Sequence, residues 1–189
     1  MQIVRAHQRL ELERTAQEEA LGEILLEENA RLEIVYRIDK VEDWQETCMI
    51  RLMGVGAKVR IRGMMHGVNQ AKLAYWLTVE HAADKTESDI EFRGVAEDQS
   101  HLVFDGLIKV EPQVKGIVAN EQNRNLLLSN QAVVESRPRL EIDSDEVVCR
   151  HGSTVGDLDE EQLFYLMSRG VPKEEARTIL IEAFLGFIT

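Results

Sequence analysis

The run Lys58-Val-Arg-Ile-Arg62 alternates charged and apolar residues without a break. Successive side chains of a β-strand point to opposite faces, so this alternation indicates a strand with one buried face and one face in water. The same period of two recurs in Asp89-Ile-Glu-Phe-Arg93 and, less regularly, in residues 31–38 and 101–110. The sequence therefore predicts a mainly β protein built from many short strands.

Turn-like groups separate these runs. They are Glu28-Asn29, Gly54-Val-Gly56, Gly67-Val-Asn69 and Glu97-Asp-Gln-Ser100. A weak repeat also runs through this part of the chain, in which a small residue is followed by apolar residues at the second and fourth positions after it. Its copies are Ala30/Leu32/Ile34, Ala57/Val59/Ile61, Ala71/Leu73/Tyr75, Ser88/Ile90/Phe92 and Ser100/Leu102/Phe104. A stacked β-solenoid and a β-sandwich both produce such a pattern, so the period alone leaves the two folds open.

The period changes after residue 155. Asp159-Glu-Glu-Gln162 is a helix-capping sequence, and it predicts a helix to residue 167 or 168 with Gly170 just beyond its end. Pro172 then begins a second helix. The apolar stripe expected on that helix is Ala176, Ile179, Leu180, Ala183, Phe184 and Phe187. We therefore expect a β core over residues 1–155 and a C-terminal helical region over residues 156–189.

Composition and charge exclude several classes of function. The 189 residues include 22 basic and 34 acidic ones, for a net charge of −12, which opposes binding to nucleic acid or to an anionic membrane. No apolar run approaches the roughly 20 residues that a membrane helix needs. The first ten residues lack the apolar stretch of a secretory signal, so we expect a cytoplasmic protein. Its two cysteines are then expected to be reduced.

Cys149 and His151 are the strongest candidates for chemistry. They lie two positions apart, so on a strand both side chains share one face. Thiolate and imidazole form part of a ligand set for iron or zinc, but two ligands do not complete a tetrahedral site. From spacing alone, a buried cysteine beside an ordinary surface histidine is the simpler interpretation. No G-x-x-x-x-G-K-[ST] sequence is present, so we expect that the chain itself does not hydrolyse nucleotide.

Two segments resemble the SufB/SufD family. The first is Asn123-Arg-Asn-Leu-Leu-Leu-Ser-Asn-Gln-Ala132, followed by Arg137-Pro-Arg-Leu-Glu-Ile142. The second is Glu146-Val-Val-Cys-Arg-His-Gly-Ser-Thr-Val-Gly156, which leads into Leu163-Phe-Tyr-Leu-Met-Ser-Arg-Gly170. The family pattern there is D-V-x-C-S-H-G-A-T-V-G followed by F-Y-L-x-S-R-G. The resemblance spans most of the chain and is strongest from Asn123 onward.

This resemblance implies a right-handed parallel β-helix followed by a short helical region, and so favours the solenoid. It also favours strands in the first 27 residues, around Leu10 and Leu12 and over Gly22-Glu-Ile-Leu-Leu26. By function it implies a non-catalytic scaffold subunit for iron–sulfur cluster assembly. Such a subunit pairs through its β-helix with SufB or a second copy of itself, and it binds the ATPase SufC through its C-terminal helices. The second helix then either caps the end of the solenoid or docks into a partner.

The resemblance also implies which residues matter. A family histidine at the shared interface matches His151, and the family cysteine before it matches Cys149. Both are thereby implied ligands of a transient iron–sulfur cluster, or of iron, at a subunit interface. The run resembles SufD more than SufB, since the sulfur-accepting cysteine of SufB would fall at about Arg124. Arg150 replaces the family serine, and its positive charge is expected to favour the thiolate of Cys149.

Full-length members have an N-terminal helical region that this sequence lacks, so it resembles a short member or a C-terminal fragment. Two other functions stay open. One is a docking module for SufC or SufB that holds no metal. The other is a metal-dependent enzyme that uses His151, Cys149 and acidic residues.

Overall fold

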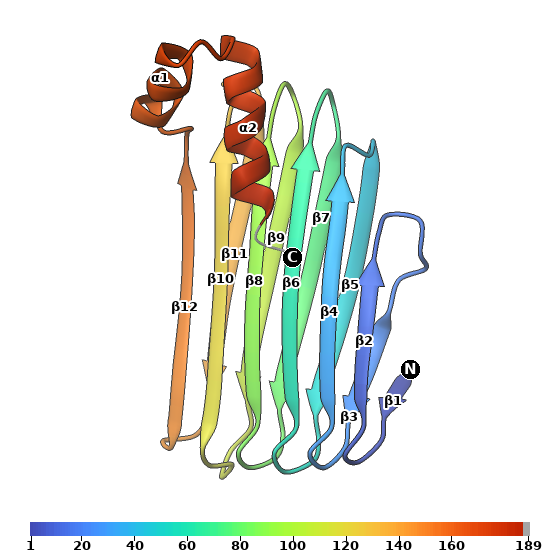
Figure 1. Ribbon diagram of the computed structural model, residues 1–189. Coiled ribbons are helices and arrows are strands. Elements are labelled where there is room, and N and C mark those ends of the chain that lie inside the picture. Colours follow the sequence, from blue (N-terminus) through green and yellow to red (C-terminus); the bar gives the residue numbers. More distant parts are fainter. Residues whose placement is uncertain (187–189) are drawn as a thin grey trace.

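The computed structural model describes residues 1–186, and two parallel six-stranded sheets dominate it. The chain alternates between the sheets, so each sheet collects every second strand. The odd sheet contains β1 (Gln2–Val4), β3 (Gly22–Leu26), β5 (Asp43–Leu52), β7 (Lys72–His81), β9 (His101–Val110) and β11 (Val133–Ile142). The even sheet contains β2 (Arg9–Arg14), β4 (Arg31–Asp39), β6 (Lys58–Gly67), β8 (Glu87–Ala96), β10 (Ile117–Leu127) and β12 (Val147–Gly156). Figure 1 shows the two sheets face to face.

Strand register shows how the coils stack. Arg31 pairs with Lys58, Lys58 with Glu87 and Glu87 with Val118, so one coil takes about 30 residues, a typical solenoid period. Neighbouring strands pair in parallel in both sheets, which a sandwich of antiparallel strands would not do. The fold is the parallel β-helix that the resemblance implied, and the strands expected in the first 27 residues are confirmed as β2 and β3.

The weak repeat of small residues gave the correct register between neighbouring strands of each sheet, except for one copy. Ala30 and Ala57 are neighbours in the even sheet, and Ala71 and Ser100 are neighbours in the odd sheet, as their following residues show. Ser88, however, pairs with Val59 and lies two residues beyond the position the repeat assigned to it. Because turn lengths differ between coils, the sequence spacing does not give the register.

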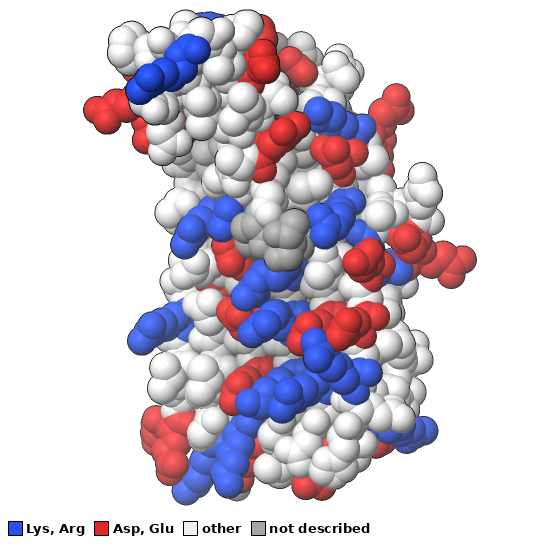
Figure 2. All heavy atoms as spheres, in the orientation of Figure 1, with Lys and Arg blue, Asp and Glu red and all other residues white. Residues whose placement is uncertain are grey.

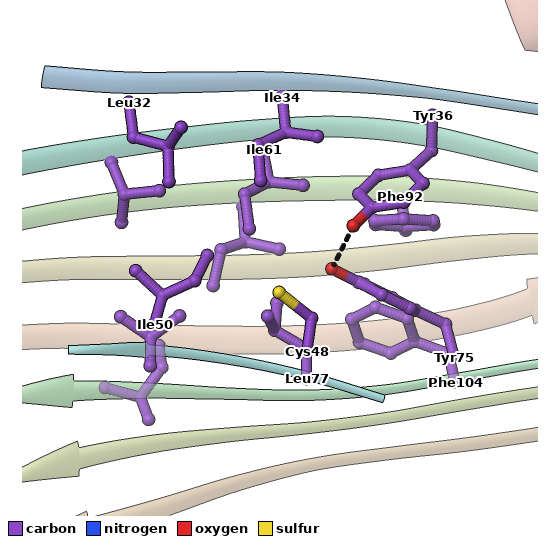
Figure 3. Close-up of a cluster of buried hydrophobic side chains, with 14 of the residues drawn as sticks. Leu32, Ile34, Tyr36, Cys48, Ile50, Ile61, Tyr75, Leu77, Phe92 and Phe104 are labelled. Atoms are coloured by element: carbon purple, nitrogen blue, oxygen red, sulfur yellow. Dashed lines mark hydrogen bonds between the residues drawn. The ribbon is translucent and has the colours of Figure 1, made fainter. Parts of the chain in front are cut away.

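The core lies between the sheets. Tyr36, Tyr75, Phe92 and Phe104 form a buried aromatic stack that crosses from one sheet to the other, with ring centroids 4.9 Å apart for Tyr36–Tyr75 and for Tyr75–Phe92 and 5.2 Å apart for Phe92–Phe104 (Figure 3). Each such contact contributes about 0.5–1.5 kcal/mol beyond the burial of its area. The stack needs Gly63, since a Cβ there would lie 2.1 Å from the ring of Phe92. Tightly packed side chains therefore fill the space between the two sheets in the middle coils.

Two helices follow the last strand, α1 (Glu160–Ser168) and α2 (Lys173–Leu185). The predicted caps are confirmed. Asp159 Oδ1 accepts hydrogen bonds from the amides of Glu161 and Gln162 at 2.9 and 3.1 Å. Gly170, with φ of 89°, follows the end of α1 in the left-handed region, which glycine adopts without strain.

Helix α2 lies on the outer face of the even sheet, over β8 and β10 (Figure 1). Its Ile181 and Leu185 pack against Val95 of β8 and Leu126 of β10. Arg93 of β8 donates a hydrogen bond from Nη1 to the carbonyl of Phe184 at 2.6 Å. The expectation that this helix caps the end of the solenoid is therefore wrong, and no other described residue covers the last coil.

The apolar stripe predicted for α2 is wrong in part. Ala176, Ile181 and Leu185 are its buried residues, whereas Ile179 and Ala183 are exposed. Phe187 lies outside the described residues. Among the described helices, neither is long and apolar enough to cross a membrane.

Charged side chains cover the outer face of the even sheet, as Figure 2 shows from that side. Several bases form ion pairs with acids on the neighbouring strand. Lys58 Nζ lies 2.7 Å from Glu87 Oε1, and Arg62 Nη2 lies 2.5 Å from Asp89 Oδ2. In both half-buried pairs an acid neutralises the base, so these bases are no evidence for an anion site.

Candidate functional site

Strand β12 places both predicted site residues. It is the last strand of the even sheet, and within the described part of the chain it hydrogen-bonds to β10 alone. In register, Cys149 lies beside Ala119 and His151 lies beside Glu121. Both β10 residues are buried, so Cys149 and His151 face the inside of the solenoid.

The last coil leaves these inward-facing residues uncovered. Cys149 is half-buried and packs against the apolar core, whereas His151 is exposed. Neither is in a disulfide, and Cys48 is likewise a free thiol. The His151 ring has no hydrogen bond or ion pair to another residue of the described range 1–186. A thiol and an imidazole thus stand side by side at the open end, available to an incoming ligand.

The expected effect of Arg150 on Cys149 is wrong. Burial raises the pKa of the Cys149 thiol above its usual value, which disfavours the thiolate. Arg150 is next to it in sequence but points to the opposite, outer face of the strand, where it is exposed. A metal ion bound at the sulfur would favour the thiolate.

Strand β10 brings a group that the sequence analysis missed. Glu121 is 0% exposed, and within the described residues neither of its carboxylate oxygens has a hydrogen-bond partner. Its carboxylate fills the space in front of Gly106 on the facing strand β9, where a Cβ would lie 1.5 Å from Oε1. Burial, with a smaller contribution from the charge of Asp105, raises the pKa of Glu121 to about 8. The alternation of inward and outward residues along β10 places position 121 inside, and this alternation could have identified Glu121 from the sequence.

Polar residues continue along the inner face of β10. Asn125 Nδ2 donates to Asn123 Oδ1 at 2.6 Å, and Asn123 Nδ2 donates to the carbonyl of Phe92 at 3.3 Å. Across the opening, Ser153 of β12 and Ser136 of β11 share a hydrogen bond of 2.7 Å between their hydroxyl oxygens. The inner face of β10 is therefore polar from Glu121 to Asn125, whereas its first inward-facing residues, Ile117 and Ala119, belong to the apolar core.

Arg124 does not belong to this inner set. It is exposed on the outer face of β10 and donates a hydrogen bond to Gln122 Oε1 at 3.0 Å. The position at which a SufB-type cysteine was expected thus points away from Cys149 and His151.

The inner groups do not form a complete metal site. Within residues 1–186, no three His, Cys, Asp or Glu side chains are grouped closely enough to hold a metal ion. Cys149 and His151 supply two donors of the types that iron accepts. Further ligands have to come from a rearranged side chain, a partner chain or inorganic sulfide.

Cys48 and His81 contrast with this pair, because both are enclosed by the middle coils. Burial raises the pKa of the Cys48 thiol to about 12, so it stays protonated and unreactive. Burial lowers the pKa of His81 to about 4, and its ring lies 2.8 Å from Thr86 Oγ1 and 2.9 Å from Ser88 Oγ. Both groups are parts of the core.

Comparison with known proteins identifies a family and several related proteins. Residues 23–184 match the profile described as SUF system FeS cluster assembly, SufBD core domain. The chain is 35% identical over 147 residues to an iron–sulfur cluster assembly SufBD family protein of Mycobacterium leprae, a match that covers 74% of this chain and 38% of that protein. It is 34% identical over 139 residues to the iron–sulfur cluster assembly protein SufD of Escherichia coli, covering 74% of this chain and 33% of SufD.

A further relative is the iron–sulfur cluster assembly protein SufD of Bacillus subtilis, with 40% identity over 106 residues, 56% of this chain and 24% of that protein. The aligned part of the chain thus spans between 24% and 38% of the length of these curated relatives.

Proposed function

Because this chain belongs to the SufBD core family of the SUF system for iron–sulfur cluster assembly, we propose that it is a non-catalytic scaffold subunit that holds a nascent cluster in the cytoplasm. One observation carries the proposal. Cys149 and His151 face the same way at the uncovered end of the solenoid, where two protein donors meet space for more. The iron and the cluster are cargo, and they occupy the site only during assembly.

A partner chain completes the site. Among residues 1–186, strand β12 pairs with β10 on one side only, and its other edge offers backbone N–H and C=O groups that no described strand pairs. Such edges are covered in proteins or pair with another chain. We assign this edge to SufB or to a second copy of this chain, which would bring its own donors next to Cys149 and His151.

The helices supply a second contact surface. Helix α1 buries none of its own residues, and Phe164 and Tyr165 are 72% and 57% exposed. Met167 is exposed beside them. An apolar patch of this kind marks a protein-interaction site, and we assign it to the ATPase SufC. Movements driven by SufC would then reach the cluster site through the short connection between β12 and α1.

Anaerobic reconstitution tests the scaffold role. The chain, assembled with SufB and SufC, is supplied with ferrous iron and sulfide, and the visible absorption of the cluster is recorded. We expect His151→Ala to abolish most of that absorption and Cys149→Ala to reduce it. Arg150→Ala is the matched control, because its side chain lies between the two on the outer face of the same strand.

The alternative is a docking module that binds SufC or SufB and holds no metal, and the same exposed surfaces support it. Unchanged absorption in both site variants, with partner binding intact, would favour this alternative. The mass in solution, with and without each partner, tests the docking surfaces. We expect Phe164→Asp to lose SufC and to keep the contact made through β12.

A further inference from the structure

One column of the inner face changes its chemistry along the solenoid. In register, Ile34 lies beside Ile61 and Ile61 beside Ile90, and the column then continues with Glu121 and His151. The three isoleucines are buried and form part of the core. Two residues that bind metals thus replace the apolar side chains in the last two coils of an otherwise apolar column.

The burial of Glu121 is costly as the chain stands. A carboxylate taken out of water without a hydrogen bond loses several kcal/mol, so buried carboxylates are almost always paired or bound to a metal. Within residues 1–186, both oxygens of Glu121 lack a hydrogen-bond partner. Asp105 adds a second negative charge nearby. The positive charge of Arg139 acts in the opposite direction, but burial outweighs it and the pKa of Glu121 stays raised. A bound cation would supply the direct partner that the described residues do not provide.

Glu121 lies within reach of the two residues already assigned to the site. It and His151 are direct neighbours on adjacent strands, about 4.8 Å apart along the sheet, and both face inward. Cys149 is two residues from His151 on the same face. The carboxylate now points across the core toward Gly106. To join the other two donors, its side chain would have to rotate toward β12.

We propose that Glu121 is a third protein ligand, an inner carboxylate that joins His151 and Cys149 around one divalent transition-metal ion. This inference rests on the proposed function, because it takes the two outer ligands from there. A carboxylate, an imidazole and a thiolate suit ferrous iron, and also Co²⁺ or Zn²⁺. Three ligands leave the fourth tetrahedral position open for sulfide or for a donor from the partner chain. The first iron would accordingly bind to this chain before the cluster is complete.

Titration with Co²⁺, a coloured substitute for ferrous iron, tests the inference. The full chain is titrated anaerobically with Co²⁺ alone, and the d–d and sulfur-to-cobalt absorption bands give ligand types and affinity. We expect Glu121→Gln, which preserves the shape of the side chain, to weaken binding at least about tenfold. Glu141→Gln is the control, because it removes an exposed carboxylate from β11 and should leave the affinity unchanged. A Co²⁺-dependent rise in Tm should follow the same pattern, which separates loss of a ligand from loss of folding.

The outcomes separate this inference from the proposed function. Weaker binding in His151→Ala with full affinity in Glu121→Gln overturns the role of Glu121 and leaves the scaffold site intact. A wild-type chain that takes up no Co²⁺ also overturns the inference, while cluster assembly with the partners still decides the scaffold role. Full affinity in His151→Ala removes the basis of both.

Discussion

Two buried acidic side chains on the inner faces, Glu46 and Glu121, differ in whether the fold gives them hydrogen-bond partners. Glu46 of β5 is 3% exposed and accepts hydrogen bonds from the Tyr36 hydroxyl at 2.9 Å and from the amide of Leu21 at 3.2 Å. The Arg14 guanidinium lies 3.8 Å from its second oxygen. Glu121 of β10 is at least as buried and, within residues 1–186, has no such partner.

The difference shows where in the solenoid buried polar groups have hydrogen-bond partners and where they lack them. Early in the solenoid a buried charge comes with its donors, as a structural network requires. On β10, beside the last strand, a buried carboxyl group comes without them, next to an exposed imidazole and a half-buried thiol. A buried polar group without a partner departs from the pattern of the rest of the core, and such departures concentrate at functional sites.

The largest loss of stability is expected from removal of Glu46, the carboxylate that has hydrogen-bond partners. Glu46→Ala leaves Tyr36 and Arg14 without their acceptor, and removal of one partner from a buried pair typically costs about 3–5 kcal/mol. Denaturant unfolding should show this loss. Glu121→Ala, measured in parallel, should not be destabilising to the same extent, because no donor loses its partner. An equal loss in the two variants would contradict the contrast.

The second prediction concerns pH and the unpartnered carboxylate, with metal removed by a chelator. The pKa of Glu121 is raised to about 8 in the folded chain, against an ordinary value of 4.5, so the folded state keeps its proton longer than the unfolded state. Stability is therefore full below pH 4.5 and falls as the pH rises toward 8, by on the order of 4 kcal/mol. Glu121→Gln should remove this decline, as unfolding at pH 5 and pH 9 would show. Parallel curves for the wild type and the variant would rule it out.

His81 should give a pH dependence of the opposite sign. Its folded pKa of about 4 lies below its ordinary value of 6.5, so the unfolded state takes up the proton first. Stability is then full above pH 6.5 and declines as the pH falls toward 4, by on the order of 3 kcal/mol. Because carboxylates also titrate there, the difference between the wild type and His81→Gln is the quantity to measure. No change in slope would mean that the ring is hydrated in the folded state.

Much of the fold follows from local rules. The alternation at Lys58-Val-Arg-Ile-Arg62 predicted β6, and the capping sequence at Asp159 predicted the start of α1, because both depend only on residues close in sequence. The choice of a solenoid over a sandwich did not follow from local rules, since both have the same period of two. The resemblance of the segments after Asn123 to a family made that choice.

The site was harder to predict for a physical reason. The placement of Cys149 and His151 on one face follows from strand geometry. The isolation of Glu121 depends on Gly106, which faces it from the other sheet, and on the register that brings His151 beside it. These contacts are set by coil closure and turn length, which the repeat misjudged at Ser88. The raised pKa of Cys149 likewise depends on burial, which sequence neighbours such as Arg150 do not reveal.

The smallest effect on stability is expected from the hydrogen bond between Ser153 and Ser136 at the open end of the solenoid. Ser153→Ala removes the hydroxyl that bonds to Ser136 across the opening, and because that bond is exposed, water replaces it. We expect a change in stability within about 0.5 kcal/mol. Ser88→Ala is the matched substitution in a closed coil, where loss of the hydroxyl leaves Nε2 of the buried His81 ring unpaired, although Nδ1 keeps its contact with Thr86, and costs about 1–3 kcal/mol. A loss at Ser153 as large as that at Ser88 would mean that the last coil is closed by its own contacts, and that a partner would have to break them before it could reach His151.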